Sequence, residues 1–226
     1  MNLNVEKILI IGLGMIGSSI ALASKSKGIK VYGFDKSNNS IKEALEKNII
    51  DSKVESILDI NSKDFLKKVD LIIVAVPPKQ TLDVLNDLKN IWNTDVTITD
   101  TSSVKNHIKL NGASNIVLSH PIAGSDQSGI SAANGDLFKN KKNVLCDPFN
   151  SKKGHFEKVD NFWKNALQMR TSSMSVSEHD LIFAMTSHLP HLVSYALIDS
   201  IRLSNHDVDD NAVSYTHLRA HETSPH

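Results

Sequence analysis

Short apolar runs alternate with stretches of helical periodicity along most of the chain. The first run, 7–11, is rich in β-branched residues, which is typical of a strand buried on both faces of a sheet. Apolar residues then recur at Ile16, Ile20 and Ala23, as on one face of a helix, and Gly28 is expected to end that helix. Further strands, together with the residues that leave them, are predicted within 30–35, 69–76, 96–105, 115–121 and 143–148. Further helices are predicted in 41–48, 81–88 and 156–167.

This alternation predicts the fold class. Strands that alternate with helices are joined by right-handed crossovers and form a parallel sheet. We therefore expect an α/β protein with a Rossmann-type, doubly wound, mostly parallel sheet in residues 1–175. A second, all-helical domain is expected to begin in 176–212. In sheets of this kind, ligands bind beyond the carboxyl ends of the strands.

The segment "GLGMIG" follows the first predicted strand with the spacing of a dinucleotide-binding turn. Gly12 permits the tight turn, Gly14 lets the backbone approach a pyrophosphate, and Gly17 lets the next helix pack close to its strand. The N-terminus of that helix offers unpaired N–H groups to phosphates. Asp35 ends the second strand, 18 residues after Gly17, and is expected to bind the adenosine ribose, which favours NAD over NADP.

Two alternatives stay open at this motif. The glycines could serve only the packing of a βαβ unit, although the complete order of strand, glycines, helix, strand and acid favours a cofactor site. Lys36 and Ser37 could in part accommodate the extra phosphate of NADP, so the choice between NAD and NADP stays open.

Pro77, Ser102, Ser103 and His120 each directly follow a predicted strand and should meet at one edge of the sheet. His120 lies in a loop of small residues where a nicotinamide ring is expected, and Ser103 is placed to hydrogen-bond it. A neutral histidine with a pKa near its usual value is a competent general base at neutral pH. The alternative is a loop histidine that caps a backbone carbonyl. The residues expected to bind the cofactor are Gly12, Gly14, Met15, Ile16, Gly17, Asp35, Val76, Pro77 and Ser103.

A long apolar helix is predicted from Ser177 onwards, with a kink at Pro190 because proline cannot make the helical hydrogen bond. His188 and His191 stand three residues apart on one face of this helix. Metal binding is not expected, because no third ligand completes the pair. We expect a packing role for His188 and a position facing the ligand crevice for His191.

Composition narrows the classes of partner. The 25 basic and 25 acidic residues balance, so nothing predicts binding to nucleic acid or to an anionic membrane surface. The single cysteine, Cys146, excludes an intramolecular disulfide and favours the cytoplasm. The apolar run near the N-terminus resembles a secretory signal peptide, but its three glycines and Glu6 argue against that interpretation.

Four motifs, "GLGMIG", "TDTSSVK", "SHPIAGSDQSG" and "SHLPHLVSYAL", resemble in their order and spacing those of the prephenate dehydrogenase family, over about residues 5–203. The resemblance implies NAD-dependent oxidative decarboxylation of prephenate, or of its amino analogue arogenate, in tyrosine biosynthesis, by a homodimer. It implies that His120 takes the proton from the ring hydroxyl and that Ser103 orients His120 beside the nicotinamide. For substrate binding it implies His191, Gly124, Ser125 and Asp126, the last in place of the glutamate of many members.

The chain departs from the family after its long helix. Members continue into a helical domain that forms the dimer and supplies an arginine for a substrate carboxylate, and no arginine stands in the matching segment here. Residues 213–226 lose the apolar period and are expected to be a non-native or disordered tail. We expect the chain to hold NAD better than it turns over prephenate. Two alternatives remain: a β-hydroxyacid-type dehydrogenase, which the His-Pro loop disfavours, and a non-catalytic NAD-binding module.

Overall fold

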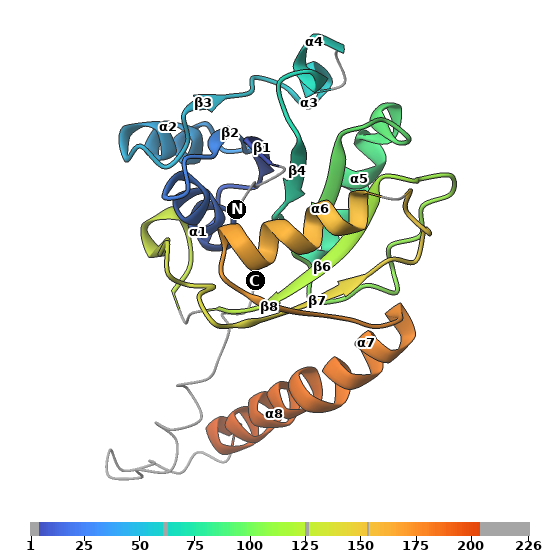
Figure 1. The fold of residues 1–226 in the computed structure, drawn as a ribbon. Coiled ribbons are helices and arrows are strands. Elements are labelled where there is room, and N and C mark those ends of the chain that lie inside the picture. Colours follow the sequence, from blue (N-terminus) through green and yellow to red (C-terminus); the bar gives the residue numbers. More distant parts are fainter. Residues whose placement is uncertain (1–4, 61–62, 125–126, 153, 204–226) are drawn as a thin grey trace.

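The computed structural model describes residues 5–60, 63–124, 127–152 and 154–203. Eight strands form one sheet in the order β3-β2-β1-β4-β5-β6-β7-β8 (Figure 1). The strands are β1 (Lys7–Ile11), β2 (Lys30–Phe34), β3 (Ser52–Lys53), β4 (Leu71–Val74), β5 (Thr97–Asp100), β6 (Ile116–Ile122), β7 (Lys142–Cys146) and β8 (Arg170–Ser173). The α-helices are α1 (Met15–Lys25), α2 (Asn38–Glu46), α3 (Ile57–Ile60), α4 (Lys63–Leu66), α5 (Pro78–Asp87), α6 (His155–Asn161), α7 (Val176–Phe183) and α8 (Leu189–Leu203). Shorter turns are the 3-10 helices η1 (Lys89–Ile91) and η2 (Ile130–Ala132) and the π-helices η3 (Phe162–Ala166) and η4 (Ala184–His188).

The direction of the strands confirms the predicted sheet. The six strands from β3 to β6 run parallel to one another. β7 then runs antiparallel to β6, and β8 runs parallel to β7. The fold is therefore a Rossmann-type, mostly parallel sheet with two reversed strands at one edge.

The central strands are buried on both faces, which explains their unbroken apolar sequences. In β1, Ile8 and Ile10 pack with side chains of α1, α2, α6 and η3. Leu9 and Ile11 point to the other face and pack with side chains of α3 and α5. Each of these β1 residues is at most 2% exposed, so the sheet separates two hydrophobic layers, as expected of a doubly wound fold.

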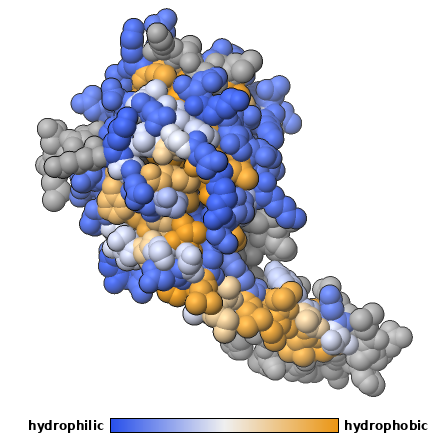
Figure 2. Space-filling model, turned by 90° about the vertical axis from the view of Figure 1, so that its right-hand side faces the viewer, coloured by the Kyte–Doolittle hydropathy of each residue, from blue (hydrophilic) through white to orange (hydrophobic). Residues whose placement is uncertain are grey.

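The long C-terminal helix is made of α7, η4 and α8 in direct succession. It begins at Val176, close to the predicted start at Ser177. The Ser175 hydroxyl accepts from the Glu178 amide, and the Glu178 carboxylate accepts from the Ser175 amide, which forms a capping box. The π-helical turn η4 ends just before α8, whose second residue is Pro190, and the predicted kink at Pro190 stays a prediction. Figures 1 and 2 show this helix leaving the body of the molecule below β8.

Candidate active site

The turn between β1 and α1 has two glycines that the chain itself requires. Gly12 has φ +97°, and a Cβ atom there would lie 2.5 Å from the carbonyl oxygen of Ala75. A Cβ atom at Gly17 would lie 1.9 Å from the carbonyl oxygen of Gly12. Both positions therefore exclude a side chain by internal contact, and Gly17 lets α1 pack against the turn, as predicted.

Gly14 is different, because nothing in the described chain excludes a side chain there. Its φ is −72°, and a Cβ atom would meet nothing within 4 Å. Gly14 caps α1, whose first turn carries no acidic side chain. The first N–H groups of a helix have no partner within the helix, so they are available to an anion. An open, anion-favouring helix N-terminus fits the pyrophosphate of a dinucleotide.

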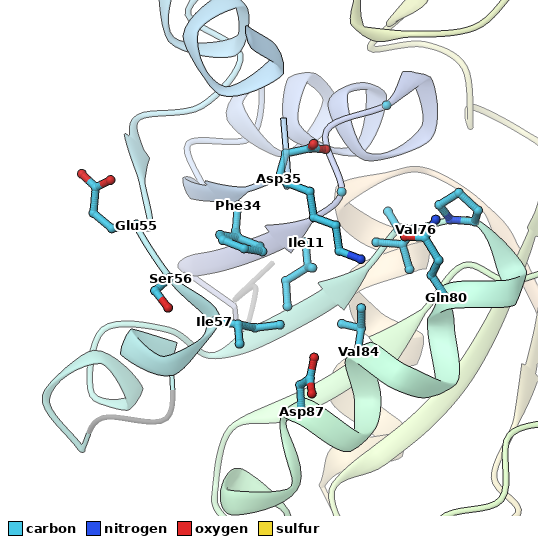
Figure 3. A pocket seen from close by; sticks show the side chains of 15 residues that line it. Ile11, Phe34, Asp35, Glu55, Ser56, Ile57, Val76, Gln80, Val84 and Asp87 are labelled. Atoms are coloured by element: carbon cyan, nitrogen blue, oxygen red, sulfur yellow. The ribbon is translucent and has the colours of Figure 1, made fainter. Parts of the chain in front are cut away.

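A pocket of about 480 Å³ lies beside this turn, between the ends of β1, β2 and β4 and the helix α5 (Figure 3). This volume is within the ordinary range for small-molecule sites. The apolar side chains of Phe34, Ile57 and Val84 face the pocket and suit a flat heterocycle. The lining residues are Ile11, Gly12, Gly14, Phe34, Asp35, Lys36, Glu55, Ser56, Ile57, Ala75, Val76, Pro77, Gln80, Val84 and Asp87.

Asp35 is held at the pocket by two backbone amides. One carboxylate oxygen accepts from the N–H of Leu13 at 2.7 Å, and the other accepts from the N–H of Ser37 at 2.8 Å. Because a carboxylate has about four acceptor positions, both oxygens can still accept from ribose hydroxyls. Of the residues expected at the cofactor, the pocket includes Gly12, Gly14, Asp35, Val76 and Pro77, and it does not include Met15, Ile16, Gly17 or Ser103.

His120 does not lie in a loop, which corrects the expectation from its small neighbours. It is part of β6, where it pairs with Val144 of the antiparallel strand β7. It is also shielded by bulky side chains, since its ring lies edge-on to the rings of His179 and Phe183, with centroids 5.0 and 4.6 Å away. The strand continues through the His-Pro pair because β7 extends the ladder beyond the end of β5.

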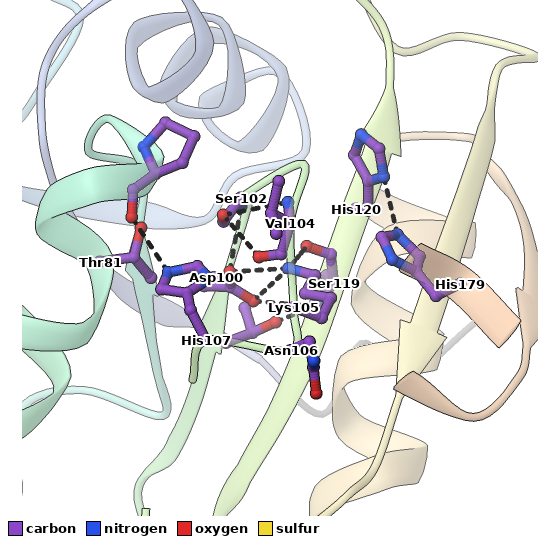
Figure 4. A network of polar contacts seen from close by, with 12 residues as sticks. Thr81, Asp100, Ser102, Val104, Lys105, Asn106, His107, Ser119, His120 and His179 are labelled. Atoms are coloured by element: carbon purple, nitrogen blue, oxygen red, sulfur yellow. Dashed lines mark hydrogen bonds and ion pairs between the residues drawn. The ribbon is translucent and has the colours of Figure 1, made fainter. Parts of the chain in front are cut away.

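Two hydrogen bonds link His120 to an acid on α7. The His120 Nδ1 and His179 Nε2 atoms are 2.9 Å apart (Figure 4), and His179 Nδ1 is 2.7 Å from Asp180 Oδ1. An ionised Asp180 can only accept, so His179 donates from Nδ1 and accepts at Nε2. His120 must then carry its proton on Nδ1, which leaves the lone pair of Nε2 available to a ligand.

Electrostatics hold both rings neutral at neutral pH. Burial, with smaller contributions from Lys105, His179 and His188, lowers the pKa of His120 to about 2. This corrects the expectation of a pKa near the usual value. Burial likewise lowers the pKa of His179, although the hydrogen bond to Asp180 opposes it. Burial favours a raised pKa for Asp180, but hydrogen bonds from His179 and from two backbone amides hold it below its usual value.

Ser103 does not make the predicted hydrogen bond to His120 among the residues that the structure describes. The Nδ1 atom of His120 is hydrogen-bonded to His179 instead. Ser103 itself is half-buried in the turn after β5, near the buried Lys105. Sequence analysis did not identify His179 and Asp180, because their role depends on a contact between residues 59 positions apart in the chain.

The structure describes two of the four predicted substrate residues. His191 is half-buried on α8 and Gly124 is exposed after β6, whereas Ser125 and Asp126 lie outside the described residues. His188 is exposed rather than packed, which corrects the expected packing role. Among the described residues, no group of three or more His, Cys, Asp or Glu side chains could hold a metal ion.

The α7–η4–α8 helix carries a stripe of exposed apolar side chains (Figure 2). These side chains are between 44% and 66% exposed: Leu181, Ile182, Met185, Leu189, Leu192, Val193 and Leu197. By length and composition alone, the segment Val176–Ile201 could also cross a membrane. Its N-terminal part, however, is attached to the Rossmann domain, because Asp180 accepts hydrogen bonds from the amides of Lys105 and Asn106.

Comparison with known proteins supports both halves of this description. Residues 20–168 match the nucleotide-binding domain of prephenate dehydrogenase, and residues 175–217 match its dimerization domain. The chain is 33% identical over 207 residues to the prephenate dehydrogenase of Bacillus subtilis, which covers 88% of this chain and 54% of that protein. It is 32% identical over 210 residues to the cyclohexadienyl dehydrogenase of Zymomonas mobilis, covering 87% of this chain and 67% of that protein.

A solved structure shows the same arrangement of elements. It is a prephenate dehydrogenase of Aquifex aeolicus in complex with hydroxyphenyl propionate and NAD+, with a TM-score of 0.83 at 27% identity. The match covers 98% of this chain and 80% of that one. The chain thus spans about half the length of the Bacillus relative and more of the solved structure.

Proposed function

The chain belongs to the prephenate dehydrogenase family, and from this premise we propose that it supplies the NAD site and the general base for oxidative decarboxylation of prephenate or arogenate. The observation that carries the proposal is the Asp180–His179–His120 chain of hydrogen bonds, which leaves a neutral Nε2 on a strand parallel to β1. The glycine turn follows β1 directly, so the base and the glycine turn both lie towards the carboxyl edge of the sheet. The family match favours this reading over a β-hydroxyacid-type dehydrogenase or a non-catalytic module.

The residues present fit NAD. The amides at the start of α1 beside Gly14 would hold the pyrophosphate, and Asp35 would accept from the adenosine ribose. The same carboxylate would repel a 2′-phosphate, which favours NAD over NADP, although Lys36 lines the pocket as well. When bound, NAD supplies a hydride acceptor. Val76, Pro77 and Ser103 are proposed to contact it further along the sheet edge.

The proposed role of His120 is to hold one proton during the reaction. Nε2 takes the proton of the ring hydroxyl while a hydride leaves the carbon that bears it. The bond between the ring and its carboxylate then breaks, carbon dioxide leaves, and the electron pair makes the ring aromatic. The phenolate oxygen recovers the proton from His120, so no proton is released overall. His179 accepts from Nδ1 throughout and keeps Nε2 aimed at the substrate.

A pKa of about 2 makes His120 a weak base in the protein without substrate. Prephenate carries two carboxylates, and negative charge next to the imidazole favours its protonated form. We propose that His191, Gly124, Ser125 and Asp126 lie along the substrate. Substrate binding would thus raise the pKa of His120 when the proton must be taken.

We also propose the assembly in which the complete protein works. Residues 1–175 form the NAD-binding domain and 176–212 the first part of a helical domain, whereas the expected tail, 213–226, lies outside the described residues. The exposed apolar stripe on α7–η4–α8 is covered by helices of that domain, in a homodimer. The balanced charge and the attachment of Asp180 to the Rossmann body favour a cytoplasmic protein without membrane or nucleic-acid partners.

The test is the rate of NAD reduction with prephenate and with arogenate, in a chain extended by a complete helical domain. His120→Asn is expected to lower kcat by about 10²–10⁴-fold, the usual contribution of a general base, with little change in NAD affinity. His155→Asn is the matched control, because His155 bonds Thr97 at the opposite end of β5. A His120→Asn enzyme with the kcat of the wild type would show that the base is assigned wrongly.

A further inference from the structure

Lys105 is a buried lysine that the proposed reaction does not use. Its side chain is 0% exposed, and its Nζ atom lies 2.8 and 2.7 Å from the two carboxylate oxygens of Asp100 and 2.5 Å from the carbonyl oxygen of Ser119 (Figure 4). An ammonium group has three N–H donors, and these three acceptors satisfy all of them. Burial lowers the pKa of Lys105, but a neutral amine would leave one acceptor without a donor.

The contacts of Lys105 join the three elements that supply the active site. Asp100 ends β5 and also accepts from the amides of Ser102 and Ser119, each at 3.0 Å. Ser119 directly precedes His120 in β6. The backbone amide of Lys105 donates to Asp180 of α7 at 3.0 Å, and Asp180 orients His179.

From this geometry we propose that Lys105 is a positioning residue for His120. Its ammonium group fixes β6 at the residue before the imidazole, and its backbone fixes the acid at the far end of the histidine pair. Its ammonium charge, held by Asp100 and by the carbonyl of Ser119, opposes protonation of His120 until an anionic substrate arrives. This inference rests on the proposed role of His120, but it can be tested without turnover.

Of the charged and titratable groups around His120, Lys105 is the buried cation that can oppose protonation of the imidazole. The acids Asp100 and Asp180 come from β5 and α7, and both are hydrogen-bonded to Lys105. His179 stays neutral at neutral pH because burial lowers its pKa. On β7, burial raises the pKa of Cys146 to about 11, so this thiol is neutral as well. His188 also contributes, but its side chain is exposed at the surface of the long helix.

The experiment is a titration of the histidine side chains by NMR, using the 226-residue chain labelled with ¹⁵N-histidine. In the wild type, His120 should show a protonated Nδ1, an unprotonated Nε2 and no titration from about pH 8 to about pH 5. Lys105→Met should raise the midpoint of His120 by about 1–3 pH units, because the cation is lost and the Asp100 carboxylate is left unpaired. The exposed Lys109→Met is the matched control and should leave His120 unchanged.

The double variant Asp100→Asn/Lys105→Met covers the case in which the single variant does not fold, because it leaves no unpaired charge of this ion pair in the core. It should still raise the midpoint of His120, by less than the single variant, and weaken the His120–His179 hydrogen bond. NAD affinity reports that the fold is intact, because the cofactor pocket is lined by other residues. A folded variant in which the tautomer and titration of His120 match the wild type would overturn the proposal. Unchanged prephenate turnover in an extended Lys105→Met chain that shows these NMR changes would instead count against the proposed function of His120.

Discussion

The three glycines of the turn after β1 lack a side chain for different physical reasons. Gly12 and Gly17 avoid collisions with carbonyl oxygens of the chain itself. Gly14 avoids no contact within the described chain, so its lack of a side chain is explained by something that binds from outside. The spacing of the glycines predicts the motif, but only the structure separates folding from binding at each position.

This separation predicts opposite effects of two identical substitutions. Gly14→Ala should leave the free energy of unfolding within about 0.5 kcal/mol of the wild type, because its Cβ meets open space. It should weaken NAD binding by about tenfold or more, which corresponds to about 1.4 kcal/mol. Gly17→Ala should destabilise the fold by about 1–3 kcal/mol or more through overpacking. Urea unfolding measures the change in stability, and calorimetric titration measures the change in NAD affinity. Equal losses of stability in Gly14→Ala and Gly17→Ala would refute the distinction.

The low pKa of His120 also predicts how stability depends on pH. The imidazole has a pKa of about 2 in the folded protein and about 6.5 when unfolded. The unfolded chain therefore binds an additional proton as the pH falls below about 6.5, and stability is lost in that direction by about 1.4 kcal/mol per pH unit per histidine. His155 and His179, whose pKa values are lowered mainly by burial, act in the same sense.

The measurement is urea unfolding of the wild type and of His120→Asn at several pH values between about 7 and about 4. The difference between their free energies of unfolding, plotted against pH, should have a slope that corresponds to about one proton. Curves that stay parallel would mean that His120 titrates alike in both states.

At the scale of elements, apolar runs predicted the strands of the sheet centre, because a strand buried on both faces needs apolar residues without a break. They did not predict β3 and β8, the two strands at the ends of the sheet, whose sequences are polar. They did not predict the direction of β7, since an apolar run has no direction. This reversal keeps His120 within β6 instead of in a loop. The contact between His120 and His179 was also out of reach, because it depends on where α7 docks.

The exposed stripe of α7–η4–α8 predicts self-association. Leu192→Glu should raise the dimer dissociation constant by about tenfold or more, because burial of a leucine side chain contributes about 1.5–3 kcal/mol. Ser200→Glu, at an exposed polar position of the same helix, should have little effect. Sedimentation equilibrium measures both. A monomeric wild type that binds lipid vesicles through this helix would contradict the proposed dimer and favour a membrane contact.

At the scale of the whole molecule, the cofactor pocket and the proposed base lie over different parts of one sheet. The pocket is formed by the ends of β1, β2 and β4 with α5, whereas His120 lies on β6 under α7. A dinucleotide bound at the glycine turn must extend across β4 and β5 to reach His120. Parallel strand order predicts this path, because the carboxyl ends of β1, β4, β5 and β6 are neighbours at one edge.

The most direct test of this account is an experimental structure of the protein with NAD bound. We expect the pyrophosphate at Gly14 and the reactive face of the nicotinamide turned towards His120 Nε2. The gap should hold one ring carbon and its hydroxyl group, with reacting atoms about 3–3.5 Å apart. A nicotinamide that points away from His120, or that lies behind the sheet, would contradict the proposed chemistry.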